Sequence, residues 1–147
     1  QGSPVLRYRT RDITYLIDEP CACGRNSRRI HRLMGRADDM LIVRGVNVFP
    51  QQVEQVLLRM ERVEPHYRIL LDREGSRDVM TVEVEMSEGL FSDDLGDVIA
   101  LERSIEADLH SEIGLQASIV LVNPHTIERS EGKARRVFDR REVTTHV

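Results

Sequence analysis

The sequence predicts an α+β fold, in which a small N-terminal β-hairpin region precedes a ferredoxin-like βαββαβ core. Two observations lead to this prediction. Apolar residues alternate in short runs typical of strands, and they recur at helical spacing in two longer segments. From residue 40 onward the segments follow the order strand, helix, strand, strand, helix, strand. That order is typical of an antiparallel sheet with both helices on one face.

The N-terminal region consists of short extended segments separated by turns. Residues 13–17 have the composition of a strand, and residues 28–34 can form a second strand that pairs with it. Because an isolated hairpin is only marginally stable in water, we expect this region to pack against another part of the protein. The composition changes after it, so we predict a boundary between residues 1–37 and residues 38–147.

The core is expected to begin with a strand region that Gly45 interrupts, followed by a helix. Residues 40–43 form a buried apolar run, and the alternation resumes over residues 46–49 after Gly45. Pro50 suits the first turn of a helix, which we predict over residues 50–61. Its apolar residues at helical spacing are Val53, Val56, Leu57 and Met60.

Three further strands are expected. Residues 67–71 and 79–86 are separated by a turn that contains Gly75, and residues 118–122 form the last strand. The polar tail from Pro124 to Val147 is expected to be a loop.

A second helix is expected between the last two of these strands. Ser92 can cap its start, and Gly114 is a natural end. Its predicted buried stripe consists of Leu95, Val98, Leu101, Ile105 and Leu109.

Composition and charge exclude two classes of partner. The net charge is −4, and acidic residues are interleaved with the arginines, so a nucleic-acid partner is not expected. The sequence has no run of about 20 apolar residues, so we expect no membrane span and no membrane partner. We also expect no signal peptide at its start.

Cys21 and Cys23 are the two cysteines, and their spacing rarely gives a sound disulfide. A secreted disulfide-stabilised domain of this length would contain more cysteines, so we expect a cytoplasmic protein. A structural zinc site needs four ligands. His31 is the nearest third candidate and no fourth is evident, so we predict a tight turn before Gly24 and no metal site.

Lys133 is the single lysine among 21 basic residues. An ammonium group on a flexible stem can follow a phosphate or carboxylate oxygen in a way that the planar guanidinium of arginine cannot. Gly132 precedes it and frees the backbone. A lysine in a surface loop without any function is the alternative interpretation of this residue.

Two acidic positions are candidates for other roles. Asp12, at the start of a strand, can accept hydrogen bonds from ribose hydroxyls or can simply cap a turn. Asp38 and Asp39, at the predicted boundary, can act as a hinge or form a charged turn.

Three strings of sequence together resemble the C-terminal part of the adenylate-forming enzymes, the superfamily of acyl-CoA synthetases, luciferases and peptide-synthetase adenylation domains. They are Tyr8-Arg9-Thr10-Arg11-Asp12, the string from Gly35-Arg36-Ala37-Asp38-Asp39 to Pro50, and Ser130-Glu131-Gly132-Lys133. The segment Arg44 to Pro50 and the cysteine turn are similar to the phenylacetate–CoA ligase branch. The resemblance covers nearly the whole chain but only the small C-terminal domain of such an enzyme.

The resemblance implies a role for five residues. Asp12 corresponds to the aspartate that binds the ribose hydroxyls, although this chain has Arg11 where the family usually has glycine. Arg36 corresponds to an arginine near the nucleotide, and Asp38 to the hinge. Gly45 corresponds to a residue of the pantetheine tunnel, and Lys133 to the lysine that bridges the carboxylate and the α-phosphate.

The resemblance also implies an ATP-dependent acid–thiol ligase that forms an acyl adenylate and then a coenzyme A thioester. Its cofactors would be ATP, Mg²⁺ and coenzyme A, bound mostly by an N-terminal adenylation domain outside this sequence. The other partner would be a small carboxylate, and the isolated chain is expected to be inactive. Two alternatives stay open: another adenylate-forming ligase of the same branch, and a small-molecule-binding regulatory domain of the ACT type, which has the same predicted fold.

Overall fold

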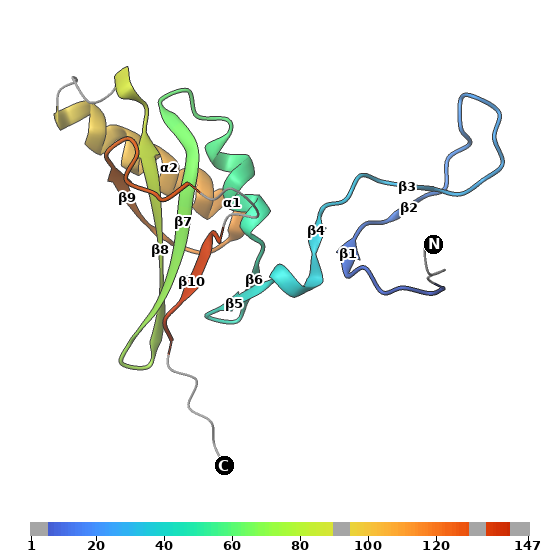
Figure 1. Cartoon of the computed structure of the whole chain (residues 1–147), viewed down its shortest axis with the longest axis horizontal. Helices are drawn as coiled ribbons and strands as arrows, with labels where there is room; N and C mark the ends of the chain where they lie inside the picture. Colours follow the sequence, from blue (N-terminus) through green and yellow to red (C-terminus); the bar gives the residue numbers. More distant parts are fainter. Residues whose placement is uncertain (1–5, 90–94, 130–134, 142–147) are drawn as a thin grey trace, which may run out of the picture. The chain divides into compact units, whose positions relative to one another are not determined.

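The computed structural model describes residues 6–89, 95–129 and 135–141 (Figure 1). The chain divides into two compact units, Gln1–Met40 and Leu41–Val147. Ser92, the predicted helix cap, and Lys133 lie outside the described residues. No helix in the described part of the chain is long and apolar enough to span a lipid bilayer.

The first unit contains two short antiparallel ladders and one turn of 3₁₀-helix. Its elements are β1 (Asp12–Ile13), β2 (Leu16–Ile17), β3 (Arg29–Ile30), β4 (Gly35–Arg36) and η1 (Ala37–Asp39). β1 pairs with β4, and β2 pairs with β3. The structure therefore has two ladders where one continuous strand was predicted over residues 13–17. Between the two ladders, residues 14–15 lie opposite residues 31–34. The two extra residues on the second side interrupt the pairing.

The second unit holds both helices and a four-stranded sheet (Figure 1). Its elements are β5 (Leu41–Val43), β6 (Val46–Val48), α1 (Pro50–Leu57), β7 (Val63–Glu74), β8 (Arg77–Met86), α2 (Leu95–Ile113), β9 (Ser118–Val122) and β10 (Val137–Asp139). The strand order of the sheet is β10-β7-β8-β9. β5 and β6 form a separate two-stranded hairpin.

The prediction of an antiparallel ferredoxin-like sheet was wrong in two respects. The sheet is mixed, because α2 carries the chain back across the sheet and β9 consequently runs parallel to β8. The predicted first strand, residues 40–43, pairs only with β6, and the edge beside β7 is occupied by β10, which runs parallel to it. The expected loop after Pro124 therefore contains the last strand of the sheet.

One face of the sheet forms the core with the two helices. Alternate side chains of β7 and β8 are buried there, whereas most side chains of the opposite face are only partly buried. α1 contacts both α2 and β7, and α2 contacts β9, so the helices lie on one face, as predicted. The central core residues are Val53, Val56, Leu57, Tyr67, Ile69, Leu71, Met80, Val82, Val84, Ile105 and Leu109.

The two helices differ from prediction in their details. α1 ends at Leu57 instead of residue 61, because the N–H groups of Arg59 and Met60 bond to the carbonyls three residues earlier and tighten the last turn. The predicted stripe of α2 is buried only toward its C-terminal end, since Ile105 and Leu109 are in the core whereas Leu95 is 70% exposed.

Arg141 joins three parts of the second unit. Its guanidinium donates to both carboxylate oxygens of Asp139, at 2.9 and 2.6 Å, and to Asp78 in β8 at 2.8 Å. It also donates to the carbonyl of Ile42 in β5 at 2.7 Å. These hydrogen bonds from Arg141 hold the pKa values of Asp78 and Asp139 below their usual range. The β5–β6 hairpin is thereby tied to the sheet.

We expect Arg141→Met to lower the urea midpoint of unfolding at pH 7. The two aspartates have lower pKa values when folded, so their contribution to the free energy of unfolding is present above pH about 4 and is lost as the pH falls through the folded pKa values. The difference between wild type and variant should therefore shrink below pH about 4. Urea titrations at pH 7 and pH 3 measure this.

Arg140→Met is the matched control for this prediction. The guanidinium of Arg140 lies 3.9 Å from Asp72 and both side chains are substantially exposed, so its loss should change the midpoint little. An Arg141→Met difference that is equally large at both pH values would contradict the ionic explanation.

Candidate functional site

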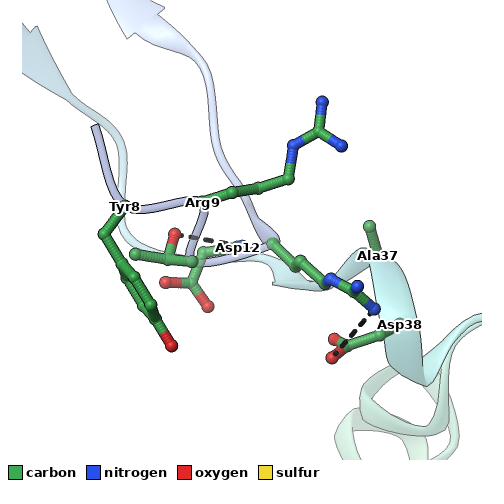
Figure 2. A pocket seen from close by; sticks show the side chains of 7 residues that line it. Tyr8, Arg9, Asp12, Ala37 and Asp38 are labelled. Atoms are coloured by element: carbon green, nitrogen blue, oxygen red, sulfur yellow. Dashed lines mark hydrogen bonds and ion pairs between the residues drawn. The ribbon is translucent and has the colours of Figure 1, made fainter. Parts of the chain in front are cut away.

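A shallow open pocket lies within the first unit, where β1 meets β4 (Figure 2). Its lining residues are Tyr8, Arg9, Thr10, Arg11, Asp12, Ala37 and Asp38. The antiparallel register places Asp12 directly opposite Arg36, and the N–H of Ala37 donates to the carbonyl of Arg11 at 2.7 Å. Two of the three sequence strings, which are about 24 residues apart, are thus brought to one site.

The side chains of the pocket point in two directions (Figure 2). Tyr8 and Asp12 project to the same side of the loop, whereas Arg9 extends away from them. The hydroxyl of Thr10 accepts a hydrogen bond of 3.4 Å from the N–H of Asp12. The pocket volume of about 610 Å³ lies within the range of small-molecule sites.

Arg36 and Asp38 form a bidentate pair at the edge of this pocket. The Nε and Nη2 atoms of Arg36 donate to the two carboxylate oxygens of Asp38 at 2.9 and 2.7 Å. These bonds lower the pKa of Asp38 and raise the pKa of Arg36. Arg11 lies 3.9 Å from the same carboxylate. The pair is well exposed, so it orients the guanidinium more than it stabilises the fold.

Arg11 adopts a φ angle of +65°, in the left-handed region that favours glycine. This conformation explains physically why a glycine is common at this position in the family that the motifs resemble. The arginine occupies the same turn at some cost in strain, and its side chain adds a positive charge beside Asp38.

Gly45 lies at the tip of the β5–β6 hairpin in the second unit. Arg44 and Gly45 are the two central residues of the turn, with φ angles of +51° and +79°, as a type I′ hairpin turn requires. No heavy atom lies within 4 Å of the position that a Cβ atom of Gly45 would occupy. Arg44 donates to the carbonyl of Gln116, which ties the turn to the segment between α2 and β9.

The predicted site residues therefore fall into separate groups. Asp12, Arg36 and Asp38 lie together in the first unit, and Asp38 precedes the boundary at Met40 by two residues. Gly45 lies in the second unit, and Lys133 is outside the described residues.

The family model for AMP-binding enzyme C-terminal domains matches residues 45–141. This chain belongs to that family. As an AMP-binding enzyme C-terminal domain, it is similar to phenylacetate-coenzyme A ligase from Thermus thermophilus, with 43% identity over 96% of this chain and 35% of the relative. The Escherichia coli enzyme of the same name is 41% identical over 97% of this chain. The chain thus spans about a third of the length of these relatives.

Solved structures show the same relationship. A domain of phenylacetate-coenzyme A ligase from Bacteroides vulgatus is 43% identical, with a TM-score of 0.67 over 73% of this chain and 97% of that domain. The 2-hydroxyisobutyryl-CoA ligase, solved in the postadenylation state with R3-HIB-AMP, is 30% identical, with a TM-score of 0.77 over 88% of this chain and 28% of that protein. These matches do not favour the alternative of a regulatory ACT-type domain.

Two residues that organise this AMP-binding enzyme C-terminal domain could not be recognised in the sequence. The alternation of its strand predicts that Glu85, like Glu83, faces outward, yet Glu85 is fully buried. In the sequence, Arg141 is one of several neighbouring arginines, yet its hydrogen bonds join β5, β8 and β10. Only the three-dimensional contacts distinguish these residues from their neighbours in the sequence.

The two cysteines of the first unit lie close to each other. The Sγ atoms of Cys21 and Cys23 lie 2.9 Å apart as hydrogen-bonded thiols, and the contact with Cys21 lowers the pKa of Cys23. His31, the nearest candidate for a third ligand, stacks on Tyr15 with 4.5 Å between ring centroids. Among the residues that the structure describes, no group of three potential ligands is arranged to hold a metal.

Proposed function

We propose that this chain is the mobile C-terminal domain of an ATP-dependent acyl-CoA ligase of the phenylacetate–CoA ligase type. The observation that carries the proposal is the 43% identity to the Thermus thermophilus enzyme over 96% of this chain. Residues 1–37 would belong to the end of the large adenylation domain and its linker, and residues 38–147 to the domain that turns. The large N-terminal domain is the expected partner, and we expect a cytoplasmic location from the cysteine usage.

In the first step, a carboxylate oxygen of an aryl-acetate substrate attacks the α-phosphorus of ATP. The new P–O bond forms as the bond to the β-phosphate breaks, and pyrophosphate leaves. Both reacting groups are anionic, so a single ammonium between them reduces their repulsion and stabilises the charge of the transition state. Lys133 is the residue that we assign to this role.

Asp12 and Arg36 are assigned to the nucleotide. A carboxylate that projects into an open pocket can accept hydrogen bonds from both ribose hydroxyls, and Asp12 has this position. Arg36 stands opposite it in the β1–β4 ladder and supplies positive charge near the ribose or phosphates. Its bidentate pair with Asp38 holds the guanidinium in place.

In the second step, the thiol of coenzyme A attacks the acyl carbon and AMP leaves. We propose that rotation about a hinge at Asp38 withdraws Lys133 and brings Gly45 to the wall of the thiol's tunnel. The absence of a side chain at Gly45, with open space around it, fits a surface that a pantetheine chain passes closely.

The residues described here do not form a site for Mg²⁺. Asp38 is already bound by Arg36, and no cluster of three acidic or histidine side chains exists within the described ranges. The prediction that Mg²⁺ and most of the ATP are bound by the N-terminal domain stays a prediction.

A calorimetric titration tests the division of the nucleotide site between domains. We expect ATP to give no binding heat with the isolated chain, because most of the nucleotide pocket is proposed to lie in the large N-terminal domain. The complete enzyme should bind ATP and release pyrophosphate when a carboxylate is supplied. Micromolar binding of ATP to the isolated chain would contradict the assignment, and a panel of carboxylates assayed with the complete enzyme would distinguish an aryl-acetate ligase from another ligase of the branch.

A further inference from the structure

Glu85 is a buried carboxylate on the face of the sheet that the helices do not cover. Successive side chains of a strand point to opposite faces, so Glu85 points away from the core that contains Val84. It is 0% exposed, whereas Glu83 on the same face of β8 is only partly buried. A buried charge is costly unless it is paired and hydrogen-bonded, so its partners identify the segment that covers it.

The segment that covers Glu85 is the one that leads to Lys133. The N–H of Ile127 donates to one carboxylate oxygen at 2.6 Å, and Nη2 of Arg129 donates to the other at 2.8 Å. Burial acts to raise the pKa of Glu85, but these donated bonds together outweigh it, so its pKa lies below the usual value. Glu85 is therefore ionised at neutral pH, and both of its oxygens are engaged by this segment.

A turn directs the segment back over the sheet. Pro124 is followed by His125 with a φ angle of +61°, and the N–H of Thr126 donates to the carbonyl of Asn123 at 3.3 Å. Proline followed by a residue with positive φ is the pattern of a type II turn, and histidine tolerates that conformation better than most residues. The turn brings Ile127 and Arg129 to Glu85.

We call residues 127–136 the lysine segment. Its C-terminal end is held by Arg136. Its carbonyl accepts a hydrogen bond of 2.7 Å from the N–H of Ile69 in β7, and its guanidinium donates to Glu54 of α1. The same guanidinium lies 4.8 Å from the ring centroid of Tyr67 and donates to its hydroxyl at 3.2 Å. In the sequence, Lys133 stands between Arg129 and Arg136, and the structure shows each of these two arginines bonded to the core of the second unit.

We propose that Glu85 is a positioning residue for Lys133, and that it acts by fixing the start of the lysine segment through Ile127 and Arg129. The inference rests on the proposed function of Lys133. Lys133 follows Arg129 by four residues and precedes Arg136 by three. Such short connections limit how far the lysine can move while both ends are held. Loss of one fixed point would misplace the ammonium, and a displacement of about 1 Å at a reaction centre can cost about 10²-fold in rate.

The test is Glu85→Gln in the complete enzyme, with the two half-reactions measured separately. Glutamine can still accept from Ile127, but its amide nitrogen cannot accept from Arg129. We expect adenylate formation to slow by about 10- to 100-fold, with a small change in the KM for ATP. Thioester formation from supplied acyl adenylate should be unchanged, and it also reports the fraction of folded enzyme.

Glu83→Gln is the matched control. Glu83 lies on the same face of the same strand and also pairs with an arginine, but this is Arg68 in β7 and not a residue of the lysine segment. We expect Glu83→Gln to leave both half-reactions unchanged. Equal loss of adenylation in the two variants, equal loss of both half-reactions in Glu85→Gln, or no loss at all would each overturn the proposal.

Lys133→Ala, assayed in parallel, separates this proposal from the function on which it rests. If Lys133→Ala slows adenylation strongly while Glu85→Gln retains the wild-type rate, the role of Lys133 stands and only the role of Glu85 is refuted. If Lys133→Ala retains adenylation, the assignment of the lysine fails, and the positioning role of Glu85 fails with it.

Discussion

Lys133→Ala in the complete enzyme is expected to slow adenylate formation by about 10²- to 10³-fold. The reason is that one preorganised donor aimed at the charge of a transition state typically contributes about 3–4 kcal/mol. Thioester formation from supplied acyl adenylate should continue, because the proposed hinge rotation removes Lys133 from that step. Pyrophosphate release measures the first half-reaction, and coenzyme A consumption measures the second.

Arg135→Ala is a suitable control for Lys133→Ala. This substitution removes a positive charge two residues from Lys133, and the guanidinium of Arg135 lies 5.0 Å from the ring centroid of Phe138. We expect both half-reactions to keep their rates. If Lys133→Ala lowers both half-reactions to the same extent, the assignment of the lysine to the first step is wrong.

Gly45→Leu in the complete enzyme should impair the second half-reaction, whereas Lys133→Ala should impair the first. A leucine at the tip of the β5–β6 hairpin would project into the space that we assign to the pantetheine chain. Thioester formation is expected to slow by about 10²-fold because the thiol is misplaced, while adenylate formation changes little. The same pair of half-reaction assays measures both effects.

Gly75→Leu controls for the strain that Gly45→Leu introduces. Gly75 has a φ angle of +61° in the turn between β7 and β8, and it too has open space around the position of a Cβ atom. A side chain there causes similar backbone strain, of about 1–2 kcal/mol, at a position without a proposed role. Equal slowing of the thioester step in Gly45→Leu and Gly75→Leu would show that strain, and not obstruction, is responsible.

The sequence was sufficient for the elements with strong local patterns. β9 occupies residues 118–122, as predicted, and α1 begins at the predicted Pro50. β10 was missed because Val137–Asp139 is too short to show a period, and its pairing with β7 depends on contacts between residues far apart in the chain. The hairpin at Gly45 was assigned to the main sheet for a similar reason, since alternation does not specify the partner of a strand.

The candidate site was predictable as a set of residues but not as an arrangement. Asp12 and Arg36 were identified from separate strings, and only the β1–β4 ladder places them opposite each other. Arg11 has a positive φ angle, which an arginine in the sequence does not predict. Glu85 has the same residue type and strand position as an ordinary exposed glutamate, so its burial is determined entirely by the segment that folds over it.

The position of β10 at the edge of the sheet also has a consequence for synthesis of the protein. During translation, β7, β8 and β9 leave the ribosome before β10, so the edge of β7 stays unpaired until the chain has been made through Asp139. An unpaired strand edge is a template for association with other chains. The nascent domain is therefore most exposed to misassembly in the interval before its last strand emerges. That strand, β10, directly follows Arg136, the residue that holds the C-terminal end of the lysine segment.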